Sequence, residues 1–394
     1  MRIDLAAPAL FRGTPSVPAL GLVTKPLGYP RSELGPGETL PGIATSGLPM
    51  ALEQCDEVVF SFGGKLGDTL LAFGAAAAVL GYLELVRPDS LPVVRILGQY
   101  AALFDQLSSL ESFDVRDLDP VPAAARTVVV GDRSGAGLSL PDGAGRVLAE
   151  YICDPEDPPC WSAGTTAYPC LPARYFLDVE RQVGLRLSEG ANFMPVLYAT
   201  GAEVMMALGK TTVGLVTATS WPARKDYGLW RYFDALRQIA EATGSEIHAL
   251  VVPGREDASD FDSEAAPDGL TVEVLSDAHY SLAGERLAGC DLVFGNDTGL
   301  THLAAAIRQP RGTGAQVIGL HARHSHGKWR TGLRWHHALA TPFSEAMNQG
   351  DLCPVRDKID DRDYGTAAEI ASITPEYLAA AALEVLNCEA EAPQ

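Results

Sequence analysis

Hydrophobic and polar positions along this chain form a repeated pattern, in which a short β-rich run precedes a longer helical stretch. The run Glu57 to Phe62 is followed by a glycine-bearing turn and then by the alanine- and leucine-rich stretch Thr69 to Tyr82. The pattern returns at Cys290 to Ile307, where a strand over Asp291 to Phe294, a polar turn and a small-residue helix from about Leu300 are predicted. Each stretch therefore predicts a strand–turn–helix unit.

Similar units cover most of the remaining chain. Further strands are predicted at residues 93–97, 127–130, 213–219, 247–253, 270–274, 316–320 and 337–340. Further helices are predicted at residues 100–110, 174–183, 230–242 and 281–289, with a terminal helix from Thr374 to about Leu386. Alternating strands and helices indicate an α/β fold built on parallel sheets with helices on both faces.

The pattern divides the chain into four regions. Residues 1–52 are rich in proline and glycine and predict an irregular extension; residues 53–200 and 201–372 predict two Rossmann-like domains, and residues 373–394 a terminal helix and tail. Ligands of open α/β sheets bind beyond the carboxyl ends of the strands. The loops 63–68 and 295–299 both follow strands, so we expect them to face each other across a cleft.

Composition excludes several classes of protein. The chain has 394 residues, 47% of them hydrophobic, and a formal net charge of −20, which argues against binding nucleic acid. No run approaches the roughly 18 apolar residues of a membrane span, so no transmembrane segment is expected, although peripheral membrane contact stays open. Seven scattered cysteines and no secretion signal favour reduced thiols in a cytoplasmic protein.

One segment of this acidic chain lacks carboxylates altogether. From Thr298 to Ser344 there is no Asp or Glu, whereas most of the eight histidines lie there with Arg308, Arg311, Arg323, Lys328, Arg330 and Arg334. The predicted helix after the 295–299 turn begins with free N–H groups, which can bind a phosphate. The segment therefore predicts an anion site, with plain helix capping by Asp297 or Thr298 as the alternative.

Several motifs in order resemble glycosyltransferase family 9, the ADP-heptose:lipopolysaccharide heptosyltransferase family. Gly64-Lys65-Leu66-Gly67-Asp68 resembles the family's first loop, and Ala218 to Lys225 resembles its second. The most specific block is Asn296-Asp297-Thr298-Gly299-Leu300-Thr301-His302-Leu303-Ala304-Ala305-Ala306, and Ile373 to Glu376 resembles the start of its terminal helix. The resemblance covers roughly residues 55 to 388.

The resemblance implies a GT-B fold and an inverting, metal-independent glycosyltransferase without a cofactor. Such an enzyme moves a sugar, for example heptose, from a nucleotide diphosphate sugar to a hydroxyl of a glycan or small-molecule acceptor. Asp68 matches the general base, and Gly64, Lys65 and Gly67 belong to its acceptor-side loop. A carboxylate at this place also caps helices, so the alternative for Asp68 is N-capping.

The donor site implied by the resemblance lies in the second domain. Asp297, Thr298, Gly299 and His302 match the donor-binding block, and Arg224 or Lys225 matches a basic residue near the diphosphate. Glu256 stands where an acid accepts ribose hydroxyls. The alternatives are a core histidine for His302, and solvated side chains for Glu256 and the basic pair.

The segment His321 to His326 departs from the family pattern and predicts a polar loop near the leaving group or base, without a metal. Two other functions stay open at this level. One is a nucleotide-sugar epimerase or hydrolase of GT-B fold, and the other is a non-catalytic nucleotide-sugar-binding protein.

Overall fold

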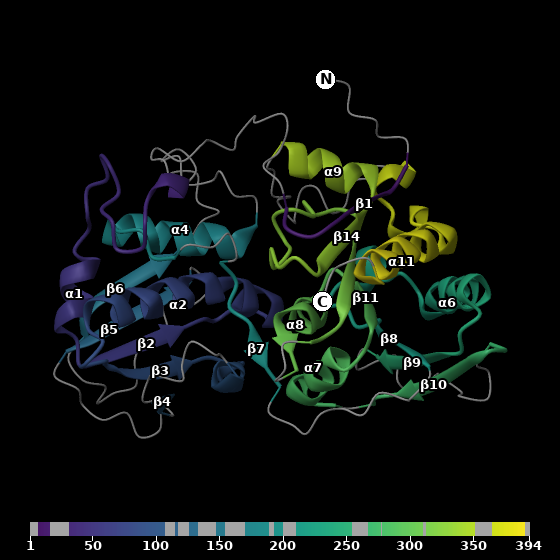
Figure 1. Ribbon diagram of the computed structural model, residues 1–394, viewed down its shortest axis with the longest axis horizontal. Helices are drawn as coiled ribbons and strands as arrows, with labels where there is room; N and C mark the ends of the chain where they lie inside the picture. The colour runs from purple at the N-terminus through teal and green to yellow at the C-terminus, as the bar shows by residue number, and fades with distance from the viewer. Residues whose placement is uncertain are drawn as a thin grey trace. The chain divides into compact units, whose positions relative to one another are not determined.

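The chain forms two compact units, each with its own parallel sheet. The structure, a computed structural model, describes residues 7–15, 31–106, 115–116, 126–132, 147–153, 170–188, 193–199, 210–253, 267–276, 278–309, 313–350 and 365–390. One unit comprises Val23–Leu197, and the other comprises Met1–Leu22 with Tyr198–Gln394. Each unit is described by itself below (Figure 1).

The first unit contains a five-stranded parallel sheet. Its strands are β2 (Glu57–Ser61), β3 (Val93–Leu97), β4 (Val115–Arg116), β5 (Thr127–Asp132) and β6 (Val147–Cys153). They lie in the order β4-β3-β2-β5-β6. The strand order reverses between β2 and β5, which is the switch point where open α/β sheets bind ligands. The loop that follows β2, with Gly64 and Lys65, lies at this point.

Two helices of this unit pack closely together. Helix α2 (Leu66–Val86) lies beside α4 (Leu171–Val183), which ends at the left-handed Gly184 as predicted (Figure 1). A Cβ atom at Gly74 would lie 2.0 Å from the carbonyl oxygen of Pro172, so the contact requires a glycine. Three shorter helices complete the described part: α1 (Leu48–Gln54), η1 (Arg31–Glu33) and η2 (Ala101–Gln106).

Helix α2 corrects the expectation that no segment is apolar enough to span a membrane. By length and composition alone, Leu66–Val86 is long and apolar enough to do so. However, 72% of its most apolar window is buried inside the structure, which is typical of a core helix. Its small residues pack against α4 and the sheet, so its apolar character is explained by burial on several sides.

The second unit contains a seven-stranded sheet. Its strands are β1 (Ala9–Phe11), β8 (Thr211–Val216), β9 (Ile247–Val252), β10 (Leu270–Val274), β11 (Leu292–Asn296), β13 (Gln316–His321) and β14 (His336–Ala340). Their order is β1-β14-β13-β11-β8-β9-β10, and all are parallel except the edge strand β1. The six parallel strands have the doubly wound order, which reverses between β8 and β11.

Alternate residues of the central strand β11 enter different cores. Leu292 and Phe294 belong to a core with helices α6 (Leu229–Thr243) and α11 (Pro375–Ala390), which lie side by side in Figure 1. Val293, between them, belongs to the core formed with α7 (Tyr280–Ala288) and α8 (Gly299–Ala306). This two-residue period is expected of a strand covered by helices on both faces.

The second unit has several shorter elements besides these. They are α5 (Pro222–Lys225), α9 (Pro342–Gln349), η6 (Gly365–Ala368), η7 (Ile370–Ser372) and the short strand β12 (Ile307–Arg308), whereas β7 (Leu197–Tyr198) lies where the two units join in sequence. The terminal helix α11 begins at Pro375, as the Thr374-Pro375-Glu376 signal predicts, and packs on α6 as part of this unit.

The prediction that residues 1–52 are an irregular extension is wrong for the described part of that region. Strand β1 pairs antiparallel with β14, aligning Ala9 with Ala340, and so completes the sheet of the second unit. Arg31 is buried in the first unit, where its Nε donates to Glu180 at 2.9 Å. A three-residue strand and a lone buried arginine have no periodicity, so the hydrophobic pattern could not reveal them.

Candidate functional site

Three neighbouring strands of the second unit bring polar residues to one edge of the sheet. Strands β8, β11 and β13 are adjacent and parallel, so the segments after their carboxyl ends meet. These segments carry Lys225 on α5, Asp297 after β11 and His324 after β13. Residues about a hundred positions apart in the chain are thereby gathered at the switch point of the sheet.

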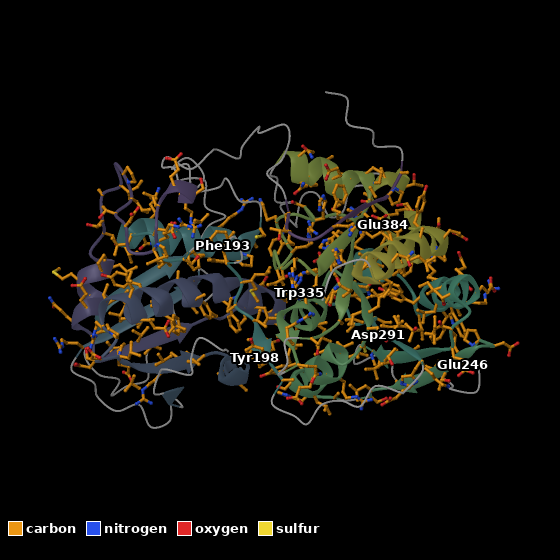
Figure 2. All side chains as sticks on the ribbon, in the orientation of Figure 1. Phe193, Tyr198, Glu246, Asp291, Trp335 and Glu384 are labelled. Atoms are coloured by element: carbon orange, nitrogen blue, oxygen red, sulfur yellow. The ribbon has the colours of Figure 1, made fainter. Side chains whose placement is uncertain are left out.

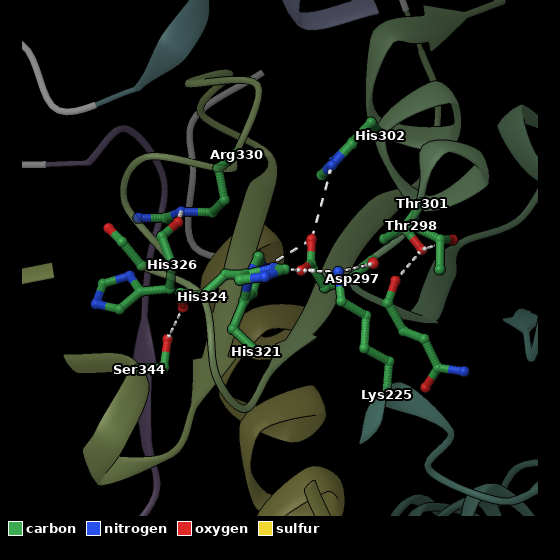
Figure 3. A network of polar contacts seen from close by, with 12 residues as sticks. Lys225, Asp297, Thr298, Thr301, His302, His321, His324, His326, Arg330 and Ser344 are labelled. Carbon is green, nitrogen blue, oxygen red and sulfur yellow. Dashed lines mark hydrogen bonds and ion pairs between the residues drawn. The ribbon is translucent and has the colours of Figure 1, made fainter. Parts of the chain in front are cut away.

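Asp297 is the centre of this cluster (Figure 3). Its Oδ2 atom accepts from Lys225 Nζ at 2.7 Å and lies 3.0 Å from His324 Nδ1. Its Oδ1 atom lies 3.8 Å from His302 Nε2 and 4.0 Å from His321 Nδ1. Lys225 Nζ also donates to the Asp297 carbonyl oxygen at 3.1 Å, so one lysine fixes both the backbone and the side chain of this residue.

The electrostatics of the cluster keep Asp297 ionised. Burial raises the pKa of this carboxyl, but the charge of Lys225 and the hydrogen bond from His324 outweigh it. The pKa of Asp297 consequently lies well below its usual range. A buried carboxylate of this kind is a strong acceptor for hydroxyl and cationic groups.

His302 and His321, which lie beside Asp297, are buried and neutral at pH 7. Burial lowers the pKa of His302 to about 4, although the charge of Asp297 opposes this shift. Burial also lowers the pKa of His321 well below its usual value. His302 Nδ1 and both ring nitrogens of His321 have no hydrogen-bond partner among the described residues. Such unsatisfied buried nitrogens usually mark a place where water or a ligand binds.

The N-terminus of α8 lies next to Asp297. Thr298 is the N-cap in extended conformation and makes no capping hydrogen bond with its side chain. Thr301 Oγ1 instead donates to the carbonyl oxygen of Asn296 at 2.6 Å. A Cβ atom at Gly295, in strand β11, would lie 2.1 Å from that hydroxyl, so the close approach of β11 to α8 requires a glycine. The first N–H groups of α8, beginning with Gly299, have no partner within the helix and can bind an anion.

Asn296 is a structural residue of the site that sequence reasoning overlooked. Its fully buried side chain donates from Nδ2 to the carbonyl oxygen of Thr217 at 2.9 Å. Its Oδ1 accepts from the backbone N–H of Tyr227 at 3.2 Å and from the Tyr232 hydroxyl at 3.1 Å. Asn296 therefore joins the ends of β8 and β11 to α6, and only its place beside Asp297 in the sequence hinted at a role.

The structure distinguishes Arg224 from Lys225, the two residues predicted to bind the diphosphate of the donor. Lys225 contacts Asp297, as described above, whereas no hydrogen bond or ion pair of Arg224 with another described side chain is found. Both residues lie on the short helix α5, and adjacent side chains of a helix point in different directions. Glu256 and the 201–209 segment lie outside the described residues. Their predicted roles stay predictions.

The cation-rich segment is explained in part by local structure. Arg330 is buried, and its guanidinium donates to the carbonyl oxygens of Phe11, Gly13, His326 and His336. Arg308 donates to the Ala315 carbonyl oxygen and lies 4.1 Å over the ring of Trp335, which is labelled in Figure 2. Arg334 is exposed, and Arg311 lies outside the described residues. The argument that this charge receives an anion is thus wrong for Arg330, because backbone carbonyls occupy its guanidinium donors.

After His321, which ends strand β13, the segment to His326 is a polar loop as predicted, and it is buried. His324 is only 8% exposed. His326 Nε2 lies 2.6 Å from Glu345 Oε2, and its ring stacks on Phe11 at 3.9 Å. In the described part of the chain no group of three or more His, Cys, Asp or Glu residues is arranged to hold a metal ion.

In the first unit, Asp68 occupies the first turn of α2 and not the loop before it. The helix begins at Leu66, so Gly67 and Asp68 are helical, and an Asp68 oxygen accepts from the backbone N–H of Lys65 at 3.2 Å. Asp68 therefore caps the helix, as the alternative proposed, and it is partly exposed. Gly64 and Lys65 form the turn itself. The predicted facing of this loop and the 295–299 turn across a cleft stays a prediction.

Comparison with known proteins bears on this arrangement. Residues 184–354 match the profile of the family described as Glycosyltransferase family 9 (heptosyltransferase), a segment that includes the whole Asp297 cluster. A comparison with well-characterised protein sequences finds no match. The family resemblance noted from the motifs is confirmed, and with it the enzyme class: a glycosyltransferase.

Solved structures show the fold over most of the chain. The glycosyl transferase family 9 protein from Veillonella parvula is 12% identical with a TM-score of 0.58, covering 84% of this chain and 97% of its own. Escherichia coli heptosyltransferase WaaC, solved with ADP, is 14% identical with a TM-score of 0.54, covering 84% and 99%. Escherichia coli ADP-heptose lps heptosyltransferase II is 12% identical with a TM-score of 0.52, covering 85% and 99%. The predicted α/β GT-B fold is thereby confirmed.

Proposed function

We propose that this chain, whose residues 184–354 carry the family 9 glycosyltransferase domain, transfers a sugar from a nucleotide diphosphate sugar to an acceptor hydroxyl. The donor binds at the switch point of the second unit. The observation that carries this proposal is the cluster of Lys225 and Asp297 beside the N-terminus of α8, because it combines a cation, a buried carboxylate and free N–H groups.

The groups of this site match the parts of the donor. The N–H groups at Thr298 and Gly299, together with Lys225, favour the negative charge of a diphosphate. Asp297 and His302 offer a carboxylate and a neutral imidazole, which suit the hydroxyls of a sugar. A departing nucleoside diphosphate gains charge as the glycosidic bond breaks, so these donors stabilise the leaving group more in the transition state than in the ground state.

Asp68 is the proposed general base. In direct displacement the acceptor oxygen attacks the anomeric carbon, its proton passes to the Asp68 carboxylate, and the bond between that carbon and the diphosphate oxygen breaks. One displacement inverts the anomeric configuration, and the step uses only this carboxylate and the donor site, with neither a metal nor a cofactor. Asp68 must then lie within about 3 Å of the acceptor hydroxyl in the ternary complex.

The acceptor is a glycan or a small molecule with a free hydroxyl, and heptose is the first sugar to test. E. coli WaaC, which shares the fold, is solved with ADP, so ADP-sugars are the first donors to titrate. Calorimetric titration with ADP, UDP, GDP and dTDP, alone and as sugar nucleotides, tests the donor site. The proposal expects one nucleotide series to bind, and absence of binding by every member would refute it.

A single substitution then tests the mechanism. Asp68→Asn keeps the acceptor of the capping hydrogen bond from Lys65, because the amide oxygen replaces a carboxylate oxygen. We expect transfer to fall by at least about 100-fold, the usual contribution of a general base, while the donor affinity is unchanged. Full transfer activity in this variant would contradict the role of Asp68. Donor turnover without an acceptor would instead favour a hydrolase or epimerase.

A further inference from the structure

The carboxylate of Asp297 is bound asymmetrically. Both strong donors, Lys225 Nζ at 2.7 Å and His324 Nδ1 at 3.0 Å, contact Oδ2. The two nitrogens near Oδ1, from His302 and His321, lie 3.8 and 4.0 Å away, beyond hydrogen-bond distance. One oxygen is therefore held by the protein, and the other lies among neutral imidazoles whose hydrogen bonds are incomplete (Figure 3).

His324 is itself held rigidly. Its carbonyl oxygen accepts from Ser344 Oγ at 2.5 Å, and its ring lies between Trp221 and Trp329, with centroid distances of 6.4 and 5.8 Å. The chain before and after His324 is tied to α9 and its N-cap: Thr341 Oγ1 donates to the Ala322 carbonyl oxygen at 2.5 Å, and Ser325 Oγ donates to Asn348 Oδ1 at 3.1 Å. A side chain fixed in this way restricts the rotation of any group to which it is hydrogen-bonded.

The hydrogen bond also fixes the tautomer of His324. An ionised carboxylate can only accept, so Nδ1 carries the hydrogen in this contact. His326, two residues later and similarly buried, bonds to Glu345 through Nε2, and no hydrogen bond or ion pair with Asp297 is found for it in the described part of the chain. The two histidines of one segment therefore present different ring nitrogens to different carboxylates, which makes His326 a matched control.

The distances around Oδ1 of Asp297 suit a hydroxyl. An oxygen about 2.8 Å from both Oδ1 and a ring nitrogen fits between atoms that are 3.8 or 4.0 Å apart. A hydroxyl can donate to the carboxylate and accept from an imidazole N–H at once, whereas a phosphate oxygen would be repelled by the carboxylate. The surroundings of Oδ1 thus select a neutral hydroxyl.

We propose that His324 is a positioning residue for Asp297: with Lys225 it holds Oδ2, and it thereby turns Oδ1 towards His302 and His321 to bind one hydroxyl of the donor sugar. This inference rests on the proposed function. It adds His321 and His324 to the sugar subsite, and it assigns the subsite to the sugar and not to the nucleotide. His324 does not contact the ligand but acts through Asp297.

The experiment compares two replacements of His324. In His324→Asn an amide nitrogen takes a place close to Nδ1, whereas in His324→Gln the amide reaches the place of Nε2. With ADP-heptose and ADP as probes in calorimetry, His324→Gln should raise the Kd of ADP-heptose about tenfold and leave that of ADP unchanged. His324→Asn should stay within about threefold of the wild type for both ligands. His326→Gln, which retains a group near Nε2, should change the Kd of neither ADP-heptose nor ADP.

A merely structural role for His324 would give a different result. In that case the substitution would weaken the binding of ADP and ADP-heptose equally, or His324→Asn and His324→Gln would bind both ligands alike. Either outcome overturns the inference. Failure of the wild type to bind ADP-heptose would count against the proposed donor. The role of His324 is then tested by a measurement that needs no ligand. Hydrogen exchange of the amides from Asn296 to His302 should speed up about tenfold in His324→Gln and not in His324→Asn. That difference must vanish in the Asp297→Asn background, and its persistence there would also overturn the inference.

Discussion

Removing the charge of Lys225 should destabilise the second unit, because Asp297 would become a buried carboxylate without its strongest partner. The Lys225 side chain is 15% exposed and that of Asp297 is 8% exposed, so water screens the pair only weakly. At the observed 2.7 Å, two unit charges attract by about 6 kcal/mol if the effective dielectric constant is about 20. Desolvation offsets part of this energy, and His324 continues to donate to Oδ2. We therefore expect Lys225→Met to cost about 3 kcal/mol.

The assay is hydrogen exchange of the amides in β11 and at the start of α8. It reports local opening, so separate unfolding of the two units does not complicate it. A loss of about 3 kcal/mol corresponds to exchange that is roughly 100-fold faster. Arg224→Met is the matched control, since it removes the adjacent cation without removing an ion pair found in the structure. It should change the exchange rate by less than about threefold.

The dependence on pH follows from the direction of the Asp297 pKa. Because that pKa lies well below its usual value in the folded protein, the carboxylate stabilises the fold above pH about 4 and loses this effect as the pH falls through the folded pKa. Without Lys225, the pKa-raising effect of burial is less opposed. The cost of Lys225→Met should therefore be fully present above about pH 4 and shrink as the pH falls further, towards the folded pKa of Asp297.

Two outcomes would refute this account. In Lys225→Met/Asp297→Asn the uncharged amide no longer requires a cation, so most of the lost protection should return. If the two substitutions are instead additive, the pair is not coupled as the geometry indicates. An equal effect of Arg224→Met and Lys225→Met would show that net charge matters and the 2.7 Å contact does not.

Two further substitutions test the packing around the site. Phe11→Ala removes the ring stacked on His326 at 3.9 Å, so the amides of residues 326–340 should lose about 1–2 kcal/mol of protection; unchanged exchange there would contradict a supporting role of β1. Gly295→Ala places a Cβ atom against Thr301 Oγ1 and should destabilise the second unit by about 1–3 kcal/mol in denaturant unfolding. Because the clash involves the Thr301 hydroxyl, Gly295→Ala/Thr301→Ala should cost less than the sum of its single substitutions, and full additivity would exclude the clash.

Many of the regular elements of the fold could be predicted from the hydrophobic pattern alone. Strands such as Val93–Leu97 and Leu270–Val274 have the predicted bounds, and Gly184 ends its helix in the left-handed conformation. These features depend on the period of hydrophobic residues and on local backbone preferences, which are written in adjacent residues. The motifs that carry the family resemblance, among them Asn296 to His302, could likewise be found in the sequence, because the residues of each motif are contiguous.

Only the tertiary structure decided which polar groups meet. Lys225 and not Arg224 reaches Asp297, and His324 joins them from a segment after β13 that has no recognisable motif. The strand order places the ends of β8, β11 and β13 together, and no local pattern records that order. The edge strand β1 was missed because three residues are too few to show a period. It is a strand only because it pairs with β14.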